Sequence, residues 1–237
     1  HWSEAQVLIE PDWHDYVGDQ IMEVGRFPYD DGFLGLVTVY HGVTQKMELQ
    51  WSASLDGMHF WRPIPRAPCL PNPPLGDYGG GMIWPFRQLV VDRDRLYVYY
   101  GALSGLHGDV YSTAPDMRLF RGGALYRASW EMGRFFAAVN ADGGGMPYSY
   151  LTTNPMDVRG RTLHLNATTR GAGELRVELL NDAFQPIPGF SKDDNIPFQG
   201  DAKMAPVAWT GGTAPPDDAV RTRFYLTTAM LYGFAWW

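Results

Sequence analysis

The chain has 237 residues, of which 45% are hydrophobic and 14% aromatic, and its formal net charge is −7. An acidic chain with no basic stripe is not expected to bind nucleic acid, and it fits a neutral or weakly charged ligand. Its single cysteine, Cys69, excludes an internal disulfide and a cysteine zinc site.

The chain contains no apolar segment that is long enough to span a bilayer, so no membrane partner is expected. Its start, His1-Trp2-Ser3, is neither an initiator methionine nor a signal peptide. This start indicates processing or truncation, and it leaves the cellular compartment open.

Residues 20–62 predict four antiparallel strands joined by tight turns. The strands are expected at 20–27, 33–41, 47–54 and 58–62. The second is almost wholly apolar and should be buried, whereas the third alternates as a half-exposed strand does. Four strands in about 43 residues are the size of one β-propeller blade.

The same pattern repeats after a proline-rich connector at 63–76. Strands are expected at 82–91, 96–102, 123–130 and 134–140, and three glycines at 79–81 allow a close backbone approach just before them. The strand order and turn positions favour a second blade. The alternative is a single meandering sandwich of eight or nine strands.

A glycine-rich segment at 142–145 marks a domain boundary, so residues 1–141 and 146–237 are predicted to be separate domains. Six strands are expected in the second, at 148–153, 162–168, 174–180, 207–209, 221–228 and 231–236. The predicted fold class is therefore all-β, with about two four-stranded blades of a partial propeller followed by a β-sandwich.

Several stretches resemble the five-bladed propeller glycoside hydrolases, a clan that includes invertases, levanases and arabinanases. In the blades they are the turn and strand at 56–62 and the strand end at 99–102. The tail is similar to the β-sandwich appended to many bacterial relatives. The similar stretches are 173–180, which leads into 186–191, and 195–209. The tail motif is fairly specific, whereas the blade motifs occur in many propellers.

The resemblance implies a carbohydrate ligand and hydrolysis by three carboxylates on different inner strands. It also implies five blades, whereas this chain supplies two and one outer strand. Because two blades leave unpaired edges, we expect further blades from a missing segment or from another chain. The first of the three carboxylates would lie in a blade that is absent.

Glu23 is the first candidate for a catalytic residue. Met22 and Val24 flank it on a strand expected to line the channel. An apolar wall disfavours the charged form of a carboxyl, which suits a general acid. The alternative is a structural ion pair with Arg26 or Arg87.

Asp77 is the second catalytic candidate, because it precedes the second inner strand and blade entries face the pocket in the resembled clan. Asp19 has the same position one blade earlier, and either residue could bind sugar hydroxyls. Alternatively, Asp77 forms a turn with the glycine amides that follow it.

Five more residues are considered as ligand contacts. His107 and Asp109 lie in a glycine-containing loop, and Trp84, Tyr78 and Trp13 could stack on sugar faces. The alternatives are a solvated loop and aromatic packing between blades. A phosphate loop, a nucleophile elbow and a His-Glu-x-x-His helix are all missing from the sequence, so no cofactor or metal is expected.

Two functions remain open. One is a glycoside hydrolase-like protein that acts on a neutral oligosaccharide or furanoside. The other is a non-catalytic carbohydrate-binding or interaction module that uses the same scaffold.

Overall fold

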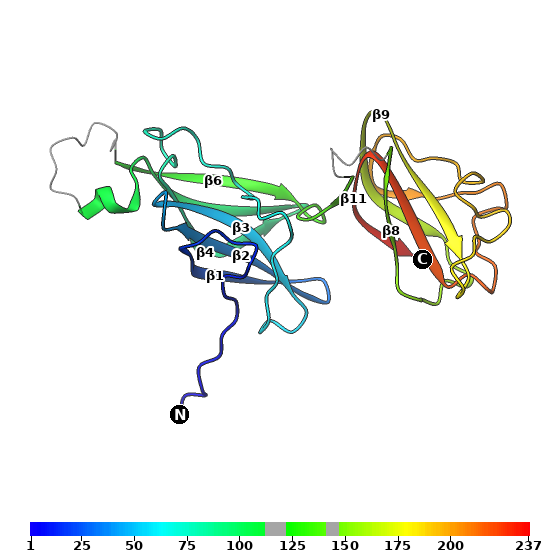
Figure 1. Cartoon of the computed structure of the whole chain (residues 1–237), viewed down its shortest axis with the longest axis horizontal. Helices are drawn as coiled ribbons and strands as arrows, with labels where there is room; N and C mark the ends of the chain where they lie inside the picture. The colour runs from blue at the N-terminus through cyan, green and yellow to red at the C-terminus, as the bar shows by residue number, and fades with distance from the viewer. Residues whose placement is uncertain (112–121, 141–146) are drawn as a thin grey trace. The chain divides into compact units, whose positions relative to one another are not determined.

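The structure is a computed structural model that describes residues 1–111, 122–140 and 147–237 (Figure 1). Those residues form strands and one short 3-10 helix, η1 (His107–Tyr111), so the predicted all-β fold class is confirmed. No helix in these ranges is long and apolar enough to cross a membrane. The chain divides into two compact units, His1–Met132 and Gly133–Trp237, each with its own sheet.

The sheet of the first unit has the strand order β1-β2-β3-β4-β5-β6. Its strands are β1 (Asp19–Tyr29), β2 (Gly32–His41), β3 (Lys46–Ser54), β4 (Met82–Asp92), β5 (Arg95–Leu103) and β6 (Gly123–Glu131). β1 to β3 form one antiparallel meander and β4 to β6 another, as expected for adjacent blades. One parallel bridge, Met47 to Met82, joins the two meanders.

Each meander has three paired strands in the described residues, where four were predicted. Residues 58–62 contribute only an isolated bridge from Trp61 to Ala53, and Phe60 donates its backbone N–H to the Leu8 carbonyl. The predicted strand 134–140 is wrong as a blade strand. Within this segment only Ala138–Val139 form a strand, β7, and it pairs with β11 of the second unit.

The second unit contains one five-stranded sheet in the order β10-β9-β11-β7, with β8 also paired to β11. Its other strands are β8 (Ser149–Thr152), β9 (Leu163–Leu180), β10 (Asp201–Pro206) and β11 (Arg221–Trp236). Two pairs of predicted strands are thus single long strands, and the segment predicted at 207–209 makes only isolated bridges.

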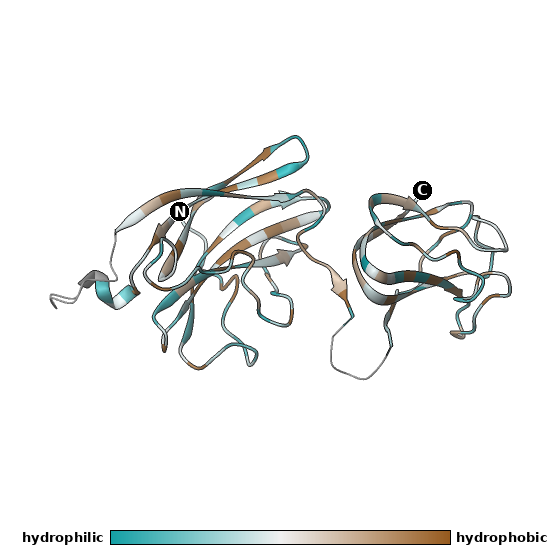
Figure 2. Ribbon diagram, turned by 90° about the horizontal axis from the view of Figure 1, so that it is seen from above, coloured by the Kyte–Doolittle hydropathy of each residue, from teal (hydrophilic) through white to brown (hydrophobic). Residues whose placement is uncertain are grey.

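β9 and β11 form one long antiparallel ribbon that bends near Gly173 and Thr228. Hydrophobic and hydrophilic residues alternate along strands of both units (Figure 2). The buried side chains of both halves of the ribbon, such as Leu165 and Val177, join one core cluster. The sheet therefore curls over its own apolar face, and its strands pass from one layer to the other at a bend.

The glycines before β4 permit the close backbone approach that the sequence predicted. A Cβ added at Gly81 would lie 1.7 Å from the carbonyl oxygen of Gly105, and one added at Gly80 would lie 2.2 Å from that of Pro74. Only glycine fits there without a backbone shift. These contacts fix the loop that contains Asp77 and Tyr78 against the end of β5.

Candidate functional site

Several predicted site residues are brought to one end of the first sheet. Backbone pairing aligns Asp19 with His41, His41 with Lys46, and Met82 with Leu103. The start of β1, the end of β2 and the loops before β4 and after β5 therefore meet at that end. The loop at 104–109 contacts the turn between β2 and β3, where His107 donates its backbone N–H to the Gln45 carbonyl at 3.0 Å.

A β-bulge at Met22 decides which face of the sheet Glu23 occupies. The register of β1 against β2 shifts between Ile21 and Glu23, so that Glu23 lies opposite Thr38 while Asp19 lies opposite His41. Cross-strand partners share a face, and successive residues alternate between faces. Glu23 and Asp19 therefore lie on opposite faces, although their spacing of four residues would place them together in a regular strand.

We call the side with Glu23 the Glu23 face. Tyr40 shares it and lies opposite Met47. Met47 bridges to Met82, which extends the face to Trp84 two residues further along β4. The rings of Tyr40 and His107 lie 5.0 Å apart, which brings His107 to the same face. Half-buried Glu23, half-buried His107 and exposed Trp84 are thus distributed over one side of the sheet.

We call the other side the His41 face. The imidazole of His41 lies between two carboxylates, with Nδ1 2.8 Å from Asp19 Oδ1 and Nε2 3.4 Å from Glu48 Oε1. Hydrogen bonding to Glu48 and to Asp19 outweighs burial and raises the pKa of His41 to about 9. Its ring is therefore a cation at neutral pH and cannot act as a general base.

The His41 face continues into a chain of buried polar side chains. Gln50 donates to Glu48 at 2.7 Å and accepts from Arg62 at 3.2 Å. Arg62 pairs with Asp15, and both side chains are almost wholly buried. This chain ties the segment before β1 to the sheet. With a side chain only 4% exposed, Asp19 belongs to this internal network, and the geometry favours a structural role for it.

The other predicted residues lie in loops. Asp109 accepts the backbone N–H of Leu106 at 2.8 Å, so its carboxylate caps its own turn. Asp77 and Tyr78 are exposed in the loop before β4. The backbone carbonyl of Asp77 accepts the N–H of Gly80 at 2.9 Å, as a turn residue does. Trp13 is 86% exposed and packs on His14.

Nothing in the described residues offers a metal site or an activated thiol. No group of three or more His, Cys, Asp or Glu side chains among them could hold a metal ion. Burial raises the pKa of the Cys69 thiol, which keeps it protonated and unreactive.

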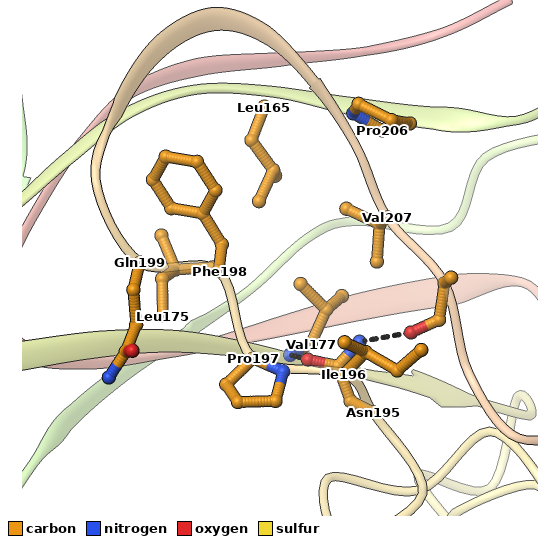
Figure 3. A pocket seen from close by; sticks show the side chains of 11 residues that line it. Leu165, Leu175, Val177, Asn195, Ile196, Pro197, Phe198, Gln199, Pro206 and Val207 are labelled. Atoms are coloured by element: carbon orange, nitrogen blue, oxygen red, sulfur yellow. Dashed lines mark hydrogen bonds between the residues drawn. The ribbon is translucent and has the colours of Figure 1, made fainter.

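A cavity of about 200 Å³ lies in the second unit, and none of the predicted site residues lines it (Figure 3). The apolar side chains of Leu165, Leu175 and Val177 line it, together with the loop at 195–199. Asn195 contributes the amide, which accepts from the Val177 N–H at 2.9 Å and donates to the Ala208 carbonyl at 3.0 Å. Because that amide is already engaged, the cavity is best described as a gap beneath a loop.

No protein-family model and no curated protein matches this chain. Among solved structures, it is similar to a glycoside hydrolase family 43 arabinoxylan arabinofuranohydrolase from Bacillus subtilis in complex with cellotetraose, at 13% identity and a TM-score of 0.27. That match covers 90% of this chain and 53% of the other.

Two further structures are similar to the chain. One is described as a glycoside hydrolase, at 12% identity and a TM-score of 0.33, with 98% of this chain and 62% of the other covered. The second is a sucrose-6-phosphate hydrolase from Lactobacillus gasseri, at 11% identity and a TM-score of 0.24. That match covers 93% of this chain and 68% of the other. The chain spans about half to three fifths of the length of the first two.

Proposed function

We propose that this chain is part of a glycoside hydrolase-like protein that acts on a neutral oligosaccharide or furanoside through the Glu23 face. The observation that carries the proposal is the shared face of Glu23, His107 and Trp84 on the first sheet. A carboxyl group, an imidazole and an exposed indole are the groups that a sugar-cleaving site combines: a proton donor, a hydrogen-bonding partner for hydroxyls and a flat apolar surface.

In this proposal Glu23 donates a proton to the leaving oxygen. Glycoside hydrolysis also needs a second carboxylate, at about 5–5.5 Å in retaining enzymes and about 6.5–9.5 Å in inverting ones. Asp19 is unsuited to that role because it lies on the His41 face and is bound to His41. Asp77, in the loop before β4, is the candidate for that role within this chain, and further blades from a missing segment or another chain would be the other source.

The test is Glu23→Gln in a form of the protein that hydrolyses glycosides. The amide keeps the shape of the side chain but cannot supply the proton, so kcat on a substrate with a poor leaving group should fall by about 10²–10⁴-fold. An activated aryl glycoside needs little protonation and should lose much less. The melting temperature should stay within a few degrees of the unchanged protein.

A structural role for Glu23 predicts a different pattern. An ion pair that is broken by Glu23→Gln would lower the melting temperature and reduce activity equally on both substrates. Full activity on the poor leaving group would exclude Glu23 as the acid, and Asp77→Asn would be the next variant to measure.

The second candidate is a non-catalytic carbohydrate-binding module. It is favoured by the ion pairs of the His41 face, which use the carboxylates of Asp15, Asp19 and Glu48 for internal contacts. Such a module would bind an oligosaccharide with the same affinity in Glu23→Gln and would never release reducing sugar. Calorimetric titration alongside the activity assay separates the two functions.

A further inference from the structure

The second unit has a group of three tyrosines on the outer side of its sheet, one exposed and two half-buried. β8 lies beside β11 (Figure 1), and register pairs Tyr150 with Tyr225. Both side chains point away from the core, because their neighbours Leu151, Phe224 and Leu226 pack into it. Tyr148 completes the group, with its ring 5.3 Å from that of Tyr225. We call these three residues the tyrosine face.

Charged side chains hold the tyrosine face in position. Glu178, on the neighbouring strand β9, accepts from the Tyr225 hydroxyl at 2.9 Å and lies 3.4 Å from the guanidinium of Arg223. That guanidinium lies 5.2 Å from the centroid of the Tyr150 ring. The Lys192 ammonium lies 5.1 Å from the Tyr148 centroid and 5.3 Å from that of Tyr225.

These contacts position the rings within the protein itself. The Glu178 side chain is only 6% exposed, so its bonds to Tyr225 and Arg223 are formed within the protein and do not depend on solvent. The Tyr150 ring is 61% exposed and lies over a fixed cation. Tyrosine gives a large amphipathic contact at a low entropy cost, and a preorganised ring lowers that cost further.

We propose that the tyrosine face is a second binding site, for a neutral oligosaccharide, that is separate from the Glu23 face. The flat rings match the C–H faces of sugar residues, and the hydroxyls of Tyr148 and Tyr150 and the Lys192 ammonium are donors for sugar hydroxyls. This binding does not require the first unit to be an enzyme, so it stands or falls separately from the proposed function.

Charge and area both favour a small neutral ligand. Arg223 is already paired with Glu178, and the net charge of −7 on the chain opposes the approach of an anionic polymer, although Lys192 places one cation on the face. Three fully exposed tyrosine side chains would offer about 450–750 Å², whereas a stable protein interface buries about 800 Å² per partner. Tyr148 and Tyr225 are already half-buried, so the free area is smaller still.

The test is calorimetric titration of the full chain with xylotetraose, arabinotetraose and, as an anionic probe, tetragalacturonate. We expect saturable binding of at least one neutral probe. Tyr150→Ala should weaken that binding by about tenfold or more, because the exposed ring is lost. Tyr150→Phe, which keeps the ring, should retain most of the affinity.

Phe184→Ala is the matched control. Phe184 is another exposed aromatic residue of the second unit with a guanidinium over its ring, that of Arg221 at 4.3 Å, and its removal should leave affinity unchanged. Equal losses in Phe184→Ala and Tyr150→Ala would overturn the proposal.

Three other results would also overturn it: no saturable binding of either neutral probe, stronger binding of tetragalacturonate, or dissociation of a dimer of the full chain by Tyr150→Ala in sedimentation. Trp84→Ala separates this site from the proposed function. A loss of binding in Trp84→Ala but not in Tyr150→Ala would remove the tyrosine face and leave the Glu23 face standing.

Discussion

His41 shows how a single side chain can link the charge of the first unit to its stability. Its ring connects Asp19, at the start of β1, with Glu48 on β3, and so ties together two strands that are not neighbours. Asp19 is a candidate residue from the sequence pattern, whereas His41 and Glu48 are not. The alternation of the strand predicted at 47–54 put Glu48 and Gln50 on one side, but nothing local indicated which residues would meet them.

The first prediction is that stability falls as His41 loses its proton. Its pKa rises from 6.5 to about 9 in the folded protein, so the stabilisation is fully present below pH 6.5 and is lost as the pH rises through 9. Allowing for solvent around a partly exposed ring, the loss should be about 1–2 kcal/mol. Urea unfolding at several pH values from 6 to 10 measures it.

His41→Gln should abolish most of that pH dependence. It should also lower stability at neutral pH, because Asp19 and Glu48 then lose the cation between them. His59→Gln is the control, since that side chain is 84% exposed and its contact with Asp56 contributes little. If wild type and His41→Gln show the same slope between pH 6.5 and 9, the buried contacts of His41 do not stabilise the fold.

At the scale of the element, local irregularities decide where side chains go. The bulge in β1 sends Glu23 to the side opposite Asp19, and the bend in the β9–β11 ribbon makes one sheet supply both layers of the second unit. Bulges and bends reorient strands because one added or strained residue changes the alternation of faces. Neither feature was evident from the hydrophobic pattern. That pattern predicted four separate strands, at 162–168, 174–180, 221–228 and 231–236, where the structure has the two long strands β9 and β11.

The second prediction concerns the bend. A Cβ on Gly173 would meet the backbone oxygens of Thr228, Thr227 and Arg170 at 2.5, 2.7 and 2.9 Å. Backbone atoms cannot move aside as a side chain does, so Gly173→Ala should cost about 1–3 kcal/mol of stability. Thermal or urea unfolding of the second unit measures the cost.

Gly233→Ala is the control in the same ribbon. No heavy atom lies within 4 Å of a Cβ built at Gly233, so this change should be neutral or slightly stabilising. If Gly173→Ala proves as stable as Gly233→Ala, the bend is not held as tightly as these distances indicate.

At the scale of the whole molecule, the sheet of the first unit ends in two strands that have no further strand partner among the described residues. The outer strands are β1 and β6, and β6 exposes Leu125 at 66% and Tyr126 at 43%. An exposed edge strand with apolar side chains is a template for pairing with another strand. The strand predicted at 82–91 is not at an edge, because β4 lies within the sheet, between β3 and β5.

The third prediction follows from the edge of β6. We expect the protein to associate at high concentration, because further blades would pair there. Leu125→Lys should reduce that association by placing a charge on the edge. Val43→Lys, at an 83% exposed turn position between β2 and β3, should leave it unchanged. Sedimentation velocity over a range of concentrations compares the two variants, and equal association in both would exclude β6 as the contact.

The sequence by itself determined the all-β class and the approximate positions of most strands in the first unit, because alternation and turn residues act over a few neighbouring positions. Only the tertiary structure decided that 134–140 leaves the second meander. There, Arg134 bonds to Asn166 at 3.2 Å and pairs with Asp201. The tertiary structure alone placed Glu23 and Asp19 on opposite faces, and it brought together the tyrosine face from β8 and β11. Such arrangements depend on contacts between residues distant in the sequence, and local pattern does not encode them.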